Sequence, residues 1–526
     1  MEKKIPIFKT INELIETRTY PVLFSILVIS LLIRFLLLPE RWINPDEGAH
    51  LYDAKFILDG KIPFIDYSSR MPIYVYMLAA FLKGFGVNYI SGRLLPLFSN
   101  IGIGIIVFLI GKKLFNSNKI ALLASAIYLF SPLSILWSVV VKTELPETLF
   151  VCSGMLLMLT YIKSEKENYH LLFFSGFFFA LAYYVRESSI AIFMASVLFM
   201  IYFHRLHVIK IIKSSIIMFL GYFLVFFIII LYFSSFVSMP IILESKLNPL
   251  ETIKDPINKL FTVPDKTTND EKSNYTPQSL WQTIGEWILV LKLNSFLFFG
   301  AFIFFLSFIL KNKINIMISK LQFAFLSLWI SALTIFYLYY SIQTNFYNQY
   351  FGEFMPVMSL ILAYVIVFLI SEIETHNALK GYAVKISLIT IMVLFISSLS
   401  LINFSFGSVW SPDTVDEVSQ YIRSNSVKED VVLSGAMIWT FESNTRPFMD
   451  QNHPLRFLRE MNEDQKREIE INIETEKPKF IVLDGYTEKT YIRNINNISN
   501  IINGSYVLRK EVSGSYYPVK VFEVKN

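Results

Sequence analysis

Long apolar runs constrain the fold of this chain more than any other feature. A helix that crosses a lipid bilayer needs about 20 predominantly apolar residues, and runs of nearly this length recur from residue 20 to residue 404. The composition agrees, because 54% of the residues are hydrophobic and only 17% are charged, whereas a soluble protein carries roughly 25% charged residues. The sequence therefore predicts an all-α polytopic membrane protein, with a different organisation only near its C-terminus.

The apolar runs predict about eleven transmembrane helices. The fifth and sixth runs are short and nearly continuous, broken at Arg186-Glu187. An apolar stretch at 73–85 is too short to cross the membrane and return, so we expect it to lie at the interface. The predicted spans are 20–38, 95–111, 120–138, 147–162, 170–185, 187–203, 212–236, 287–310, 321–341, 354–371 and 384–404.

Lys and Arg residues in the short loops predict the orientation of the chain. Loops that begin near residues 112, 163, 204, 311 and 372 together hold 13 of these residues, 12 of them Lys, whereas the short loops on the other side hold only Lys142 and Arg186. Because cytoplasmic loops are enriched in these residues, we expect a multi-pass plasma-membrane protein with a cytoplasmic N-terminus. The longer segments 39–94, 237–286 and 405–526 then face outward. The net charge is only +5 and the Lys and Arg residues sit in short clusters between apolar runs, so no nucleic-acid partner is expected.

Residues 411–526 are predicted to form a small extracytoplasmic α/β domain, attached to a membrane domain of residues 1–410. Ser411-Pro412-Asp413 is a typical helix start, with the proline in the first turn. Strand-like runs then alternate with polar helical stretches, at 413–425, 430–433, 462–475 and 480–483.

Charged and polar residues gather at the predicted outer boundary of the membrane rather than inside the spans. A proton-coupled transporter would be expected to carry such residues near the midplane. The pattern instead favours an active site at the outer lipid–water boundary. The clusters are Asn44–Tyr52, Asp66–Tyr74, Lys142–Leu149, Arg186–Ser188 and Tyr347–Pro356.

The first of these clusters has a structural and a functional interpretation. Asn44 can cap a helix that begins at Pro45, with Glu47 as the capping-box partner three residues on. Asp46 can instead act as a general base, because a carboxylate takes a proton from an attacking hydroxyl held within hydrogen-bond reach. The two interpretations are compatible, since a capped helix start holds a carboxylate rigidly.

The other clusters also allow two interpretations each. Arg70 can bind a phosphate or extend to lipid headgroups. Lys142 and Arg186 can hold a phosphate leaving group, although Arg186 also suits a solvated turn. Glu147 can complement the dipole of a helix start, and Tyr350 fits an interfacial aromatic belt. A divalent metal beside the two carboxylates stays open; His50 alone is a weak indication of zinc.

Three of these segments together resemble a known family. The first outer segment contains, in order, Asp46-Glu47, Gly60, Pro63-Phe64-x-Asp66-Tyr67 and Pro72-x-Tyr74. This order resembles the first outer loop of the C-type membrane glycosyltransferases, especially the protein O-mannosyltransferases and the lipid A aminoarabinose transferases. Leu145-Pro146-Glu147-Thr148 resembles their second acidic motif, Arg186 stands where they often have a basic residue, and Tyr350 with Pro356 resembles a late motif.

The resemblance implies a helical C-type glycosyltransferase fold and a sugar transfer at the outer face. The donor would be a sugar on a polyprenyl phosphate, dolichyl or undecaprenyl, and the acceptor a protein, a glycan or a lipid. The implied catalytic acids are Asp46, Glu47 and Glu147. The implied substrate-binding residues are Tyr67, Arg70, Lys142, Glu144, Arg186 and Tyr350. No nucleotide-binding loop is needed, because the sugar arrives on a lipid.

The sequence also departs from the family's pattern. Gln349 stands where the late motif usually has an arginine, and Met71 separates Arg70 from the following proline. The C-terminal segment lacks the W-W-D-Y-G motif of oligosaccharyltransferases, which argues against transfer of a whole oligosaccharide. Two other classes stay open: a transporter or lipid flippase, although no internal repeat is found, and a non-catalytic membrane scaffold.

Overall fold

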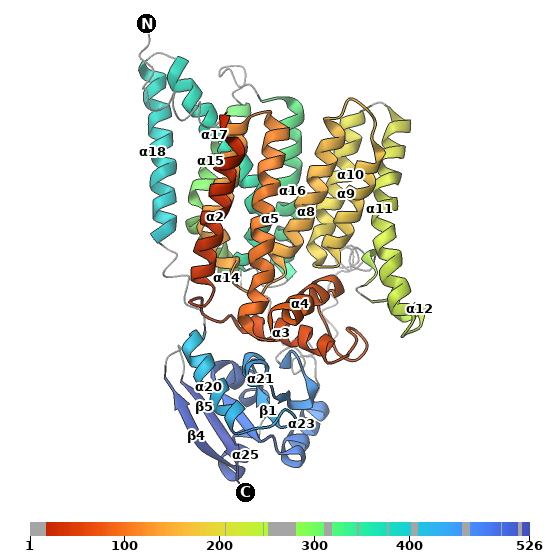
Figure 1. The fold of residues 1–526 in the computed structure, drawn as a ribbon, viewed down its shortest axis with the longest axis vertical. Coiled ribbons are helices and arrows are strands. Elements are labelled where there is room, and N and C mark those ends of the chain that lie inside the picture. Colours follow the sequence, from red (N-terminus) through yellow and green to blue (C-terminus); the bar gives the residue numbers. More distant parts are fainter. Residues whose placement is uncertain are drawn as a thin grey trace.

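The computed structural model describes residues 17–205, 207–245, 247–250, 280–309, 318–343, 347–375, 378–400, 409–454, 463–495, 497–513 and 518–525. Long helices lie side by side in a bundle, and the C-terminal part of the chain lies against one end of it (Figure 1). We refer to this end as the domain end and to the opposite one as the far end. Much of the predicted outer segment 237–286 lies outside the described residues.

The bundle and its outer segment are built from helices alone, within the described ranges. Their bounds are α2 Thr19–Leu37, α3 Pro45–Leu58, α4 Pro72–Phe85, α5 Tyr89–Phe115, α6 Asn118–Phe130, α7 Pro132–Trp137, α8 Glu144–Ile162, α9 Tyr169–Tyr183, η1 Glu187–Ser189, α10 Ile190–His204, α11 Val208–Ser234, α12 Met239–Leu243, α14 Leu280–Leu293, α15 Ser295–Ile309, α16 Lys320–Gln343, η2 Asn348–Phe354, α17 Met355–Thr375 and α18 Ala378–Ser400.

Every predicted span contains helix, but fewer helices than expected are long enough to cross a membrane. Among the described residues, 7 helices meet the length and hydropathy of a span, or up to 8 if a bent pair counts as one. The predicted spans at 120–138 and 170–185 contain only shorter apolar helices, whereas α18, which covers most of the span predicted at 384–404, has 23 residues. A helix of 15 residues such as α9 reaches about 22 Å, against a hydrocarbon core of about 30 Å. The predicted number of about eleven spans is thus met by full-length helices only in part within the described ranges, and shorter apolar helices occupy several of the other predicted spans.

Two of the predicted straight spans are broken by identifiable residues. The span predicted at 287–310 is the pair α14 and α15, which are bent by 87°. Asn294 stands at the break and its side chain donates to the Val290 carbonyl at 2.9 Å, a local bond that competes with continued helix. The span predicted at 120–138 is divided at Ser131, because Pro132 begins α7 and disfavours helix in the residue before it.

The predicted helix start at residue 44 is confirmed. The Asn44 side chain accepts from the Asp46 backbone N–H at 3.1 Å, and Glu47 Oε1 accepts from the Asn44 N–H at 2.9 Å. With Pro45 as the first residue of α3, these bonds form a capping box. The cap fixes the direction in which the first turn of α3 presents its two carboxylates.

The C-terminal part combines helices with a five-stranded sheet. The bounds are α20 Pro412–Ser424, β1 Val431–Ser434, α21 Ile438–Ser443, β2 Arg446–Pro447, η3 Phe448–Asp450, α23 Glu463–Glu476, β3 Phe480–Leu483, α24 Gly485–Thr487, η4 Glu488–Ile492, α25 Ile498–Ser505, β4 Tyr506–Val512 and β5 Val519–Val524. Both predicted strands and both predicted polar helices are present, and Ser411 caps α20 as expected.

The strand order is β2-β1-β3-β5-β4. The central strand pair β1–β3 is parallel, whereas β5 runs antiparallel to both β3 and β4. Because successive strand residues point to opposite faces, Val432 and Phe480 lie in one core while Leu433 and Ile481 lie in another. The second core is closed by α23 and α25.

The first core continues from the sheet into the outer segment of the bundle. Its buried side chains come from α3 and α4 as well as from α20, α21 and the sheet, including Leu51, Phe56, Ile438 and Trp439. A Cβ at Gly48 would lie 2.2 Å from the backbone nitrogen of Ile438, so only a glycine allows α3 and α21 to approach this closely. The outer segment and the C-terminal part therefore share one hydrophobic core.

Candidate active site

A cavity of about 510 Å³ lies at the domain end of the bundle. Its wall is formed by the first turns of α3 and α8, the segment before α4, the turn at η1, and the residues of η2. Most of the charged side chains singled out in the sequence face it. Its lining includes Asp46, His50, Arg70, Lys142, Glu144, Arg186, Gln349 and Tyr350.

Asp46 is paired with Lys142 in this cavity. The Lys142 ammonium donates to Asp46 Oδ2, and the side chain of Asp46 is 39% exposed while that of Lys142 is 7% exposed. Burial raises the pKa of Asp46, whereas the charge and the hydrogen bond of Lys142 lower it. The resulting pKa lies well below the usual carboxylate range. Asp46 is therefore ionised and open to the cavity on one side.

His50 lies one turn after Asp46 on the same face of α3. Burial, and then the charges of Arg70 and Lys142, lower the pKa of His50 well below its ordinary value. The imidazole packs edge-on against Tyr74 at 5.2 Å. A neutral His50 adds no positive charge to the cavity, so the cations that line it are Lys142, Arg70 and Arg186.

Glu47 points away from the cavity and into the protein. Arg93 Nε donates to its Oε2 at 2.8 Å and Arg93 Nη2 to its Oε1 at 2.9 Å, and both side chains are fully buried. The Val141 N–H also donates to Oε2 at 3.0 Å. With the capping-box bond, both carboxylate oxygens are satisfied. We infer a structural role for Glu47 instead of the predicted catalytic one, because it does not line the cavity.

Arg70 reaches the cavity wall from the segment before α4. Its Nη1 lies 3.1 Å from Oδ2 of Asp53, a carboxylate that is fully buried, and Arg70 itself is 24% exposed. Tyr67 does not line the cavity; its hydroxyl donates to the Asp53 carbonyl at 2.9 Å. The predicted substrate-binding residue Tyr67 thus supports the segment that carries Arg70.

Arg186 lies among carboxylates from other elements. Its Nη1 is 3.0 Å from both Glu144 Oε1 and Glu353 Oε1, and its guanidinium stacks over the ring of Tyr350 at 4.5 Å. The Tyr337 hydroxyl donates to Glu353. These contacts hold the guanidinium in one orientation at the cavity wall.

Glu147 lies behind the wall rather than in it. Its Oε1 accepts from the Ser188 hydroxyl at 2.7 Å, and the same hydroxyl lies 3.4 Å from Glu353 Oε1. Glu147 is 1% exposed and does not line the cavity. Direct contact of Glu147 with a substrate is therefore not part of this arrangement, although the residue supports the turn at η1.

Several residues of the site were not found from the sequence. Arg93 and Asp53 were not singled out, and Glu353 lay in a named cluster without a role; each forms an ion pair in which the carboxylate is buried. The one available signal was a charged residue at the edge of an apolar run, as for Arg93 before the second span. Such a signal cannot identify the partner, because each pair joins different elements.

The described residues contain no group of three or more His, Cys, Asp or Glu side chains arranged to hold a metal ion. Three carboxylates at or beside the cavity are each paired with a cation, namely Asp46 with Lys142, Asp53 with Arg70 and Glu144 with Arg186. These pairings do not favour a divalent metal at Asp46.

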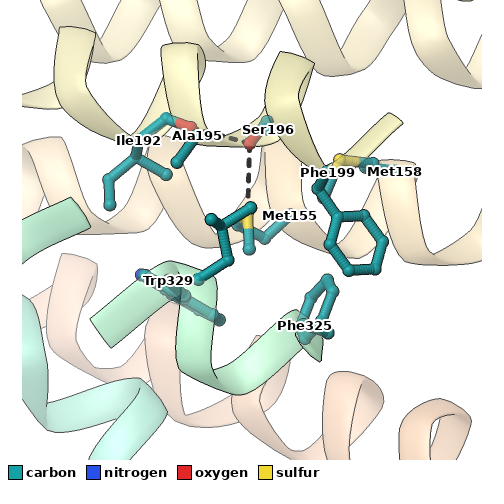
Figure 2. Close-up of a pocket in the computed structure, with 9 residues that line it drawn as sticks. Met155, Met158, Ile192, Ala195, Ser196, Phe199, Phe325 and Trp329 are labelled. Carbon is teal, nitrogen blue, oxygen red and sulfur yellow. Dashed lines mark hydrogen bonds between the residues drawn. The ribbon is translucent and has the colours of Figure 1, made fainter. Parts of the chain in front are cut away.

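A second cavity, within the bundle, is too small to compete as a substrate site. It measures about 10 Å³ and lies between α8, α10 and α16, among side chains such as Met155, Phe199 and Trp329 (Figure 2). The Ser196 hydroxyl donates to the Ile192 carbonyl at 2.8 Å and contacts the Met155 sulfur at 3.5 Å (Figure 2). Such a space holds about one water molecule.

The chain matches a sequence family over part of its length. Residues 69–233 match the model of the dolichyl-phosphate-mannose-protein mannosyltransferase family. The matched range includes Arg70, Lys142, Glu144 and Arg186, whereas Asp46 and the late motif lie outside it. None of the curated proteins compared with this chain matches it in sequence.

Solved structures with the same fold cover nearly the whole chain. The oligosaccharyltransferase of Archaeoglobus fulgidus aligns with a TM-score of 0.58 at 13% identity, covering 88% of this chain and 69% of its own. ArnT from Cupriavidus metallidurans, bound to undecaprenyl phosphate, aligns with a TM-score of 0.58 at 11% identity, covering 95% and 98%. The predicted resemblance to the C-type membrane glycosyltransferases and the predicted fold class are thus confirmed, and the chain is an integral membrane protein.

Proposed function

We propose that this protein is an inverting hexosyltransferase that moves a sugar from a polyprenyl phosphate to an acceptor at the outer face of the plasma membrane. One observation carries the proposal: an ionised Asp46 faces a cavity of about 510 Å³ that is also lined by Lys142, Arg70 and Arg186. A base beside clustered cations suits a reaction in which a hydroxyl loses a proton while a phosphate leaves.

In the proposed reaction the acceptor's hydroxyl oxygen attacks the anomeric carbon of the donor sugar. The bond from this carbon to the phosphate oxygen breaks, the electron pair stays on the phosphate, and the hydroxyl proton passes to Asp46. Negative charge grows on the leaving polyprenyl phosphate, where donors fixed in advance are most effective. Arg70 and Arg186 are already held by Asp53, Glu144 and Glu353, so little reorganisation is required.

Lys142 has two parts in this proposal. In the structure it donates to Asp46, which keeps the carboxylate ionised but makes it a weak base. A donor phosphate in the cavity would draw the ammonium away, and the pKa of Asp46 would rise. The base would then become stronger only when a donor is bound.

The solved structures support the choice of donor. The Archaeoglobus fulgidus protein AglB has been solved with an inhibitory peptide and a dolichol-phosphate, at a TM-score of 0.58 to this chain, and ArnT with undecaprenyl phosphate. By analogy, we propose a polyprenyl phosphate as the carrier of the sugar for this chain as well. The acceptor is a protein, a glycan or a lipid. Residues 411–526 form the extracytoplasmic domain in this proposal, and the N-terminus is cytoplasmic.

The test is transfer of a radiolabelled sugar from a polyprenyl phosphate by the purified full-length protein. Asp46→Asn should lower turnover by about 10²–10⁴-fold, the usual contribution of a general base, without loss of folded protein. Asp66→Asn is the matched control, because Asp66 lies in the same outer segment, accepts a local bond from the Ile62 N–H at 2.6 Å and does not line the cavity. Near-normal turnover in Asp46→Asn would remove Asp46 from the role, and no release from any lipid-linked sugar would overturn the donor assignment.

A further inference from the structure

The C-terminal part of the chain reaches the cavity wall through Asn452. This residue follows η3 and is 3% exposed. Its Nδ2 donates to Asp53 Oδ1 and, at 2.7 Å, to the backbone carbonyl of Ser68. Both partners are acceptors, so the amide must present its nitrogen to them.

Asp53 connects Asn452 to a residue that lines the cavity. Its other oxygen, Oδ2, accepts from Arg70 Nη1 at 3.1 Å, and Arg70 lines the cavity beside Asp46 and Lys142. A series of hydrogen bonds therefore links Asn452, in the C-terminal part, through Asp53 to Arg70 in the cavity wall.

Each side chain in this series of hydrogen bonds restricts the orientation of the next one. An arginine side chain has several rotatable bonds, and ordering it is costly unless a fixed partner holds it. The partner here is a fully buried carboxylate, which itself requires hydrogen bonds to stay ionised and in place. Burial raises the pKa of Asp53, and the charge of Arg70 and the hydrogen bond from Asn452 oppose this rise.

We propose that Asn452 is a positioning residue of the donor site: it orients Asp53, which holds Arg70 where the guanidinium binds the phosphate of the lipid-linked sugar. The C-terminal part thereby completes the donor site. This inference rests on the proposed function. It assigns Asn452 a task beyond holding the two parts of the protein together.

Other bonds between the two parts provide a control for simple docking. The hydroxyl of Tyr52, the neighbour of Asp53 on α3, donates to the Thr445 carbonyl at 2.9 Å. Tyr52 does not line the cavity. Tyr52→Phe therefore removes a hydrogen bond from the same interface but leaves the hydrogen bonds between Asn452, Asp53 and Arg70 in place.

The experiment compares Asn452→Asp with Tyr52→Phe in the full-length protein. The aspartate keeps the shape of Asn452 but replaces its donor with an acceptor facing Asp53. We expect KM for the polyprenyl-phosphate sugar to rise by about tenfold and kcat to fall as well, because Arg70 both binds the phosphate and stabilises the charge that grows on it. Affinity for a polyprenyl phosphate alone should fall by about the same factor. Tyr52→Phe should leave these quantities unchanged.

A structural readout keeps the inference testable without turnover. Amide hydrogen exchange in residues 61–71 should be faster in Asn452→Asp, and in Asn452→Ala should the aspartate variant fail to fold, but not in Tyr52→Phe. If the Asn452 variants keep the wild-type KM, lipid affinity and amide exchange rates, the inference is overturned and the proposed function stands. The same holds if Tyr52→Phe changes these quantities as much as the Asn452 variants do. A wild-type protein that neither binds polyprenyl phosphate nor transfers sugar would overturn both.

Discussion

At the scale of single residues, the cavity wall includes three cations, each of which is held by a carboxylate from another element. Lys142 is held by Asp46, Arg70 by Asp53, and Arg186 by Glu144 and Glu353. A buried ion pair contributes little net stability, because desolvation offsets the attraction. The value of these pairs lies in orientation, since they fix positive charge around a cavity open to an anionic ligand.

Lys142 controls the proton affinity of Asp46, so its removal should change the pH dependence of the reaction. Asp46 must be ionised to act as a base. Burial raises its pKa, but Lys142, with a smaller effect of Arg70 and His50, brings it below the ordinary value. Lys142→Gln removes the positive charge but leaves Asp46 buried, so the pKa of Asp46 rises. The acidic limb of the pH profile of kcat/KM should then move to higher pH by at least about one unit. Lys61→Gln should keep the wild-type limb, because Lys61 pairs with Asp450 at 3.2 Å and neither residue lines the cavity. An unmoved limb in Lys142→Gln would mean that another group titrates.

Glu47 and Asp46 are neighbours, yet their replacement should have opposite consequences. Glu47→Gln leaves the fully buried guanidinium of Arg93 without a charged partner, which costs about 3–5 kcal/mol. Thermal unfolding in detergent should show a strongly destabilised protein, and Asp46→Asn should unfold close to the wild type. A Glu47→Gln protein of normal stability that has lost turnover would instead restore the catalytic role first predicted for Glu47.

At the scale of elements, the approach of α3 and α21 joins the bundle to the C-terminal part. Gly48→Ala should separate these helices, because the new Cβ would lie 2.2 Å from the Ile438 nitrogen and 2.7 Å from the Met437 carbonyl carbon. We expect a loss of about 1–3 kcal/mol, the usual cost of overpacking, measured by thermal unfolding, and faster proteolysis near residue 438. Gly84→Ala, in α4 with nothing within 4 Å of its Cβ, should be neutral or stabilising. Equal behaviour of the two variants would contradict the close approach.

At the scale of the whole molecule, local patterns predicted the elements but not their partners. Apolar runs, the capping box at Asn44 and the strand-like run at 480–483 are local, and the structure contains all of them. The pairing of Asp53 with Asn452, which are 399 residues apart, depends on tertiary contacts. The bend at Asn294 involves a local bond, but it interrupts an apolar run that predicts one straight span. The candidate site could therefore be assigned to one boundary of the membrane, whereas the supporting carboxylates could not be named from sequence.

The orientation of the whole chain decides on which side of the membrane the cavity opens. Asp46, Glu144, Arg186 and Tyr350 line one cavity, so the segments that carry them lie at the domain end with the C-terminal part (Figure 1). The short loops rich in Lys and Arg fall at the other ends of the same helices, as in the loop at 163–168 after α8. By the positive-inside rule, the cavity should open outward.

Labelling with a membrane-impermeant maleimide tests this orientation. Val427 is 60% exposed, and Val427→Cys should react in intact cells. Glu165→Cys, at an exposed position in the loop at 163–168, should react only after permeabilisation. Cys152 is the single native cysteine and is fully buried, so it should give no background. The reverse pattern would place the cavity and Asp46 on the cytoplasmic side, where an acceptor would have to be sought among cytoplasmic molecules.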